Sequence, residues 1–108
     1  MATDDRRPLT ETIYYVLLAL GAPLHGYGIM QRVGELTAGR VVLGAGTLYG
    51  ALTNLTEKGW IRPLPEAADE RKKEYVITDA GRGIVAGELE RLEELLLNGR
   101  RVTQEGWR

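Results

Sequence analysis

Apolar residues recur every three or four positions along the first part of the chain, which predicts amphipathic helices. A first helix is expected from about Leu9 to Leu20, with Thr10 as its N-cap. Gly21 and then Pro23 are the signals that end it. The apolar run inside this helix is far too short to span a bilayer, so no membrane segment is expected.

A second helix is expected from about His25 to Thr37. Ile29, Val33 and Leu36 form its inward stripe. Gly39 stands where a left-handed C-cap is expected. The three apolar residues that follow at 41–43 are too few for more than a short edge strand.

The stretch from residue 43 to residue 59 predicts a third helix with two different sides. Leu48, Leu52 and Leu55 are spaced by four and then three, which puts them on one side. The other side carries short polar groups and one aromatic hydroxyl. These outward residues are Thr47, Tyr49, Thr53 and Asn54. A helix anchored by leucines, with a weakly charged hydrogen-bonding outer face, suits insertion into a DNA major groove.

The hydrophobic period then changes from that of a helix to that of a strand. Residues 60–64 predict a short strand, which Pro63 restricts to the edge of a sheet. Residues 73–78 alternate, with Tyr75 and Ile77 facing inward, as in a half-buried strand. A polar loop joins the two strands into a hairpin. The predicted fold is therefore α+β, a mostly helical winged helix-turn-helix with a two-stranded β-wing.

A last helix is expected over residues 79–101, capped by Thr78 or Asp79, with a repeating apolar seam. The seam residues, spaced four, three and four apart, are Val85, Leu89, Leu92 and Leu96. We expect a second copy to cover this seam, so the helix is a dimerisation helix. The predicted organisation comprises a flexible N-terminal arm (1–8), a DNA-binding domain (9–78), the dimerisation helix (79–101) and a tail (102–108).

Composition excludes several classes of protein without selecting one. The chain has 108 residues, enough for one domain with a modest core. It has no cysteine, so a reducing cytoplasm fits best. His25 is the only histidine, and no nucleophile, carboxylate pair or metal-ligand cluster is apparent. No enzyme, metal or cofactor is therefore expected.

The charge distribution is more informative than the net charge of −1. Residues 40–73 contain six bases and four acids, whereas residues 79–99 contain two bases and five acids. This polarity fits a basic face for phosphates and an acidic end held away from them. At the tip of the predicted hairpin stand Arg71, Lys72 and Lys73, which we expect to straddle a phosphate backbone. The alternative is a solvated turn, because glutamates flank the triplet on both sides.

Two tyrosines are candidates for phosphate contact, since a tyrosine ring can pack while its hydroxyl reaches out. Tyr49 is favoured because it lies off the leucine stripe, and for Tyr27 a role in binding and a role at the edge of the core both stay open. Tyr75 is expected in the core.

Three motifs in this order resemble the PadR family of bacterial transcriptional regulators. They are HGYGIMQRV (25–33), GTLYGALTNLTEKGWI (46–61) and RKKEYVITDAGRGIV (71–85), and the resemblance covers roughly residues 9–97. It implies a homodimeric winged-helix repressor of the short branch with a single C-terminal helix, sometimes released by a small hydrophobic ligand. By position, the residues that match family positions implicated in DNA contact are Tyr27, Thr47, Tyr49, Lys58, Lys72 and Lys73.

The chain departs from the family pattern at the start of the third helix. Gly44 and Ala45 stand where the family usually has serine and proline, so a helix-capping side chain is lost. Gly50, where a proline is frequent, should loosen the helix by up to ~1 kcal/mol relative to alanine. Residues 79–106 contain no aromatic side chain, which argues against a flat aromatic effector stacked on the last helix.

These observations predict a sequence-specific DNA-binding regulator, a repressor that binds a palindromic operator as a homodimer. Its two recognition helices should lie about one turn of duplex apart, ~34 Å. The rival interpretation is a winged-helix module that binds proteins and not DNA, which the nearly neutral charge favours slightly.

Overall fold

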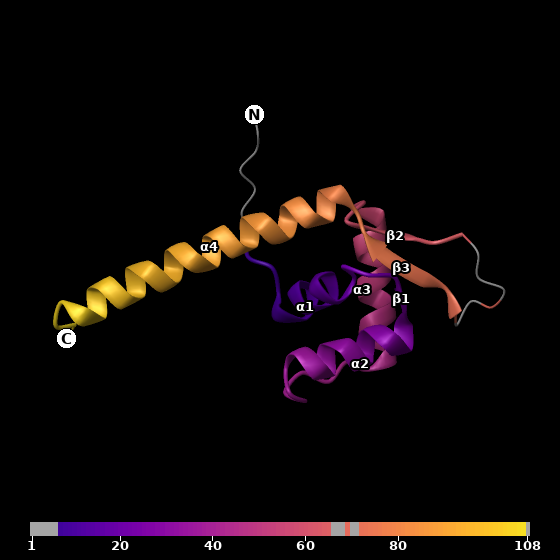
Figure 1. The fold of residues 1–108 in the computed structure, drawn as a ribbon, viewed down its shortest axis with the longest axis horizontal. Helices are drawn as coiled ribbons and strands as arrows, with labels where there is room; N and C mark the ends of the chain where they lie inside the picture. The colour runs from indigo at the N-terminus through magenta and orange to yellow at the C-terminus, as the bar shows by residue number, and fades with distance from the viewer. Residues whose placement is uncertain (1–6, 66–68, 70–71, 108) are drawn as a thin grey trace.

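A small body of helices and a sheet, with one long helix extending from it, makes up the protein (Figure 1). The computed structural model describes residues 7–65, 69 and 72–107. The elements are α1 (Glu11–Ala19), β1 (Leu24–His25), α2 (Gly26–Leu36), α3 (Ala45–Glu57), β2 (Ile61–Pro63), β3 (Glu74–Ile77) and α4 (Asp79–Gln104). The α+β winged helix-turn-helix prediction is confirmed. Most of the predicted arm, residues 1–6, lies outside the described residues.

Local capping explains where the first two helices begin. Thr10 caps α1, because its hydroxyl oxygen accepts a hydrogen bond from the Ile13 N–H at 3.2 Å. His25 caps α2 in the same way, with Nδ1 accepting from the Gly28 N–H at 3.2 Å. At the other end of α2 the C-cap is Thr37, and the left-handed backbone predicted at Gly39 begins one residue earlier, with a φ of 52° at Ala38 and 80° at Gly39.

The sheet has three antiparallel strands in the order β1-β3-β2, so the prediction of only two strands was incomplete. Leu24 pairs with Tyr75 and His25 with Glu74. The N-cap of a helix is extended, and His25 has a φ of −86° and a ψ of 173°. The two residues that lead into α2 can therefore pair with the free edge of β3. Pro63 lies on the opposite edge strand, β2, as expected.

Residues 41–43, which are too few for more than a short edge strand, form no strand. Leu43 instead points into the core, while Val42 is 85% exposed. One member of the predicted α2 stripe also lies outside the core. Leu36 is 39% exposed, because it is the last residue of α2 and leads directly into the loop before α3.

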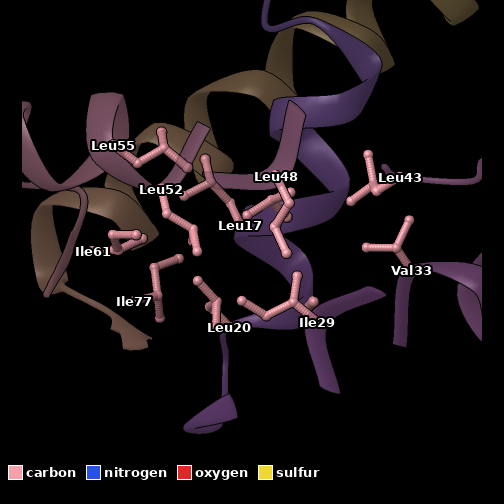
Figure 2. Packing of buried hydrophobic residues seen from close by; sticks show 12 residues of the cluster. Leu17, Leu20, Ile29, Val33, Leu43, Leu48, Leu52, Leu55, Ile61 and Ile77 are labelled. Atoms are coloured by element: carbon pink, nitrogen blue, oxygen red, sulfur yellow. The ribbon is translucent and has the colours of Figure 1, made fainter. Parts of the chain in front are cut away.

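The core lies where α1, α2 and α3 meet the sheet (Figure 2). Leu48, Leu52 and Leu55 are all within 1% of complete burial, which confirms the predicted inward side of α3. Ile77 is buried and Tyr75 packs against the cluster, as the alternation of β3 predicted. This packing fixes which side of α3 faces outward.

Helix α4 starts at a tight junction with the end of α3. Thr78 is its N-cap: the hydroxyl accepts from the Gly81 N–H at 3.1 Å and donates to the Gly59 carbonyl at 2.6 Å. The Thr78 N–H also donates to the Trp60 carbonyl at 3.0 Å. From this junction α4 continues to Gln104, three residues beyond the predicted end. Within the described ranges, no helix is both long and apolar enough to cross a membrane.

Candidate nucleic-acid interface

The outer side of α3 presents the four polar residues that the sequence selected. Thr47, Thr53 and Asn54 are exposed, and Tyr49 is 45% exposed. Gly44 is the N-cap and makes no side-chain capping bond, as the loss of a serine predicted. The first turn of α3 therefore leaves backbone N–H groups without a side-chain acceptor, a feature that suits an anionic partner.

Tyr49 reaches from α3 to the start of α2. Its hydroxyl lies 2.7 Å from the point where a Cβ on Gly26 would stand. Gly26 is buried as the first residue of α2, so the absence of its side chain makes room for the tyrosine. The next residue, Tyr27, is 63% exposed. Gly26 was not predicted as a site residue, because its contact with Tyr49 depends on how two helices pack.

The Thr53 hydroxyl donates to the Tyr49 carbonyl at 3.0 Å. This bond uses the hydroxyl hydrogen and leaves the oxygen able to accept a hydrogen bond. Glu57 lies one turn further along the same face and is exposed. Glu57 was not among the predicted site residues, although a carboxylate can accept a hydrogen bond from a cytosine amino group in the major groove.

Lys58 lies at the C-terminal cap of α3, beside the strand that follows. Its ammonium group stands over the Trp60 ring, 5.1 Å from the ring centroid. This cation–π contact places the charge at the end of α3 that meets β2. The side chain of Lys58 remains exposed.

The hairpin of β2 and β3 carries the predicted wing. Lys72 is exposed and Lys73 is half-buried, whereas Arg71 lies outside the described residues. The Leu64 N–H donates to the Glu74 carbonyl at 2.8 Å, which extends the pairing one residue beyond β2. The hairpin and the C-terminal end of α4 lie at opposite ends of the molecule (Figure 1).

Arg40, a further base within residues 40–73, has an acidic partner. Arg40 makes two hydrogen bonds to the Glu11 carboxylate, at 3.1 and 2.6 Å. This guanidinium lowers the pKa of Glu11. Arg40 therefore joins the loop before α3 to the first turn of α1. No group of three or more possible metal-ligating side chains occurs in the described part of the chain.

The predicted dimerisation seam divides into two parts. Val85 packs against the core of its own body. Leu89, Leu92 and Leu96 are exposed along the rest of α4. Other large apolar side chains exposed on the same helix are Leu95, Leu97 and Val102.

The chain is similar to known regulators in sequence and in fold. The sequence model of the Transcriptional regulator PadR-like family matches residues 15–86. An uncharacterized 37.1 kDa protein in transposon TN4556 of Streptomyces fradiae is 38% identical over 96 residues, which cover 88% of this chain and 25% of that protein. The HTH-type transcriptional regulator SarZ of Staphylococcus saprophyticus is 36% identical over 77 residues, covering 70% of this chain and 48% of SarZ.

These alignments span about a quarter of the first relative and about half of the second. Among solved structures, Bacillus subtilis PadR in complex with operator DNA has a TM-score of 0.61 and 27% identity. The match covers 76% of this chain and 48% of that chain.

Proposed function

The chain belongs to the PadR-like family of transcriptional regulators, and from this premise we propose that it represses transcription by binding a palindromic operator as a homodimer. Family membership also confirms the expectation that the chain is not an enzyme. Bacillus subtilis PadR, its structural relative, is bound to operator DNA. We place the action of this protein on DNA in the cytoplasm.

The observation that supports DNA binding most is the two-sided character of α3. Its leucines are fixed in the core, so the opposite side must face outward. That side is polar but almost uncharged, which suits recognition of base edges. We assign base reading to Thr47, Tyr49, Thr53 and Asn54, since an asparagine can pair with an adenine edge and a threonine offers a hydroxyl and a methyl.

Phosphate contacts are assigned to basic residues on either side of that helix. Lys58 lies at its C-terminal end, and Lys72 and Lys73 lie on the wing. We also assign a phosphate contact to Arg71, because it precedes the two lysines in the sequence, and to Tyr27, because its side chain is exposed at the start of α2. Such contacts set the register of the protein on the duplex and make affinity depend on salt.

Dimerisation is assigned to the exposed leucines of α4. Leu89, Leu92 and Leu96 recur at coiled-coil spacing, and a second α4 offers the same surface. A two-fold dimer would present two α3 helices to half-sites about one helical turn apart, ~34 Å. For release from DNA we propose a small hydrophobic effector.

The second candidate function is a protein-interaction module that kept the winged helix without DNA binding. The net charge of −1 favours it slightly. The two functions differ in how binding to duplex responds to salt. A wing that binds phosphates displaces counterions from the DNA, so its affinity for duplex falls as the salt concentration rises. A protein-binding surface would not give duplex binding this salt dependence.

The test removes the two described wing lysines together. We expect Lys72→Ala with Lys73→Ala to weaken binding to all duplexes and to reduce the slope of log K against log salt by about two. The matched control, Arg100→Ala with Arg101→Ala, removes the same charge from the opposite end of the molecule and should leave the slope unchanged. Equal slopes for the wing variant and the unmodified protein would contradict the assignment of the wing to phosphates.

A further inference from the structure

Glu88 on α4 is a buried carboxylate that the proposed function does not use. It is 6% exposed and is the only charged residue that is buried in the described part of the chain. Arg91 donates to it twice, from Nε to Oε1 at 2.9 Å and from Nη2 to Oε2 at 2.7 Å. The Arg91 hydrogen bonds, and to a smaller extent the nearby Leu9 backbone, lower the pKa of Glu88. A buried carboxylate is costly unless it is satisfied in this way.

Arg91 lies on the same helix as Glu88, whereas Leu9 belongs to a part of the chain that is distant in sequence. Leu9 immediately precedes the N-cap of α1, and its side chain packs against the core. Glu88 lies in the third turn of α4. The carboxylate therefore attaches α4 to the start of the DNA-binding body.

Helix α4 has another attachment almost three turns earlier. There Thr78 bonds to Gly59 and to Trp60, directly after α3. Between these two points Ile84 and Val85 pack against the core, and Glu88 is the last buried residue of α4 before its exposed half. From residue 92 to residue 107 every residue is exposed, so the second half of α4 makes no comparable attachment.

The exposed half of α4 therefore acts as a lever whose direction depends on Glu88. The 16 residue-to-residue steps from Glu88 to Gln104 span about 24 Å at ~1.5 Å per step. A tilt of about 8° at the base moves the far end by ~3.4 Å, which is the rise of one base pair when ten pairs make one turn of ~34 Å. A small change at the base is thus enough to change the register of a dimer on DNA.

We propose that Glu88 is a positioning residue that sets the distance between the two recognition helices, and so the half-site spacing that the dimer selects. The inference rests on the proposed function, because it requires a dimer formed through α4 and a DNA with two half-sites. Arg91 fixes the position of the carboxylate, and the buried carboxylate fixes α4 relative to the start of α1.

The direct test measures the distance between the two α3 helices in the dimer without DNA. The chain has no cysteine, so Glu57→Cys provides one spin-label site per copy at the exposed end of α3. In Glu88→Gln we expect the distance distribution between labels to shift or broaden by about 3 Å, the lever displacement worked out above. Glu90→Gln, on the opposite side of α4, removes the same charge and should leave the distribution unchanged.

Circular dichroism and light scattering must first show that each variant is folded and dimeric. Arg91→Lys is the second variant, because a lysine keeps the charge but cannot make the two-pronged contact. Should Glu88→Gln be unfolded, the shift is expected in Arg91→Lys instead. The proposal would be overturned if the distances between labels in every folded variant, Glu88→Gln or Arg91→Lys, match those of the unmodified protein.

The consequence for DNA is measured on duplexes selected by the unmodified protein. We expect it to bind its preferred spacing about tenfold more tightly than duplexes one base pair longer or shorter, a difference of ~1.4 kcal/mol. For Glu88→Gln this ratio should fall toward one. An unchanged ratio would refute the role of Glu88 and leave the proposed function standing. A wild-type protein that selects no duplex would refute both.

Discussion

Replacement of Gly81 by alanine tests the junction between α3 and α4. A Cβ at this position would overlap the Trp60 carbonyl oxygen and would stand 2.7 Å from Ile77 Cγ1. The carbonyl cannot move aside freely, because it accepts the Thr78 N–H at 3.0 Å. Gly83 provides the matched control, since a Cβ there meets nothing within 4 Å.

The magnitude follows from three contributions. Overpacking costs about 1–3 kcal/mol. A displaced Trp60 carbonyl would leave the Thr78 N–H without its acceptor, at about 1–3 kcal/mol. Alanine in place of glycine within a helix stabilises the folded state by about 0.5–1 kcal/mol. We therefore expect Gly81→Ala to lower the free energy of unfolding by about 3 kcal/mol and Gly83→Ala to raise it by up to about 1 kcal/mol.

The assay is urea unfolding followed by circular dichroism at one fixed protein concentration, because association makes stability depend on concentration. The two variants should differ by about 4 kcal/mol, a large part of the ~5–15 kcal/mol typical of a domain. Equal stability of Gly81→Ala and Gly83→Ala would show that the two backbones do not meet as described.

Three further outcomes are expected. Replacement of Leu92 and Leu96 by charged residues should give a monomer, as measured by light scattering, that binds the operator poorly. The reason is that each leucine contributes about 1.5–3 kcal/mol when fully buried. Gly26→Ala should displace the Tyr49 hydroxyl and weaken duplex binding about fivefold, the equivalent of one hydrogen bond of ~1 kcal/mol. The stability that Glu88 contributes should be present above its ordinary pKa of about 4.3 and lost as the pH falls further.

The sign of the pH effect follows from the cause of the shift. The Arg91 hydrogen bonds lower the pKa of Glu88 in the folded state. Folding therefore favours the carboxylate, and acid removes this contribution as the pH falls through the folded-state pKa. Urea unfolding of the unmodified protein and Glu88→Gln across this range measures it. A stability difference that grows as the pH falls would contradict the contact.

The other two predictions have their own controls. Gly34→Ala is the control for Gly26→Ala, because a Cβ at Gly34 meets nothing within 4 Å and should leave DNA affinity unchanged. Equal affinity of the two variants would show that Gly26 does not position Tyr49. A dimer that survives charged residues at Leu92 and Leu96 would move the interface away from the exposed face of α4.

Elements defined by local pattern could be predicted from the sequence, and elements defined by tertiary contact could not. The three leucines of α3 follow a helical period, so their burial was predictable. Strand β1 has only two residues and no pattern of its own, and it exists because His25 is extended before α2 and meets β3. The helical spacing of apolar residues could not show that Leu36 lies outside the core, because the apolar stripe of α2 continues to the last residue of the helix.

The candidate site divides in the same way. The polar side of α3 was predictable, because it is whatever the leucines do not bury. The approach of Tyr49 to Gly26 and the influence of the Leu9 backbone on Glu88 depend on how helices are packed. Spacing along the chain contains no sign of either contact. Base reading, phosphate contact and the dimer seam remain predictions for the experiments above.

The most direct test of the central claim is selection of bound duplexes from a random pool by the purified full chain, at low ionic strength and without added metabolites. A homodimer that directs two α3 helices into adjacent turns should enrich a palindrome with half-sites about one helical turn, ~34 Å, apart. Recovery of a pool with no enriched sequence would contradict the account. Enrichment of a single unrepeated half-site would contradict the dimer alone.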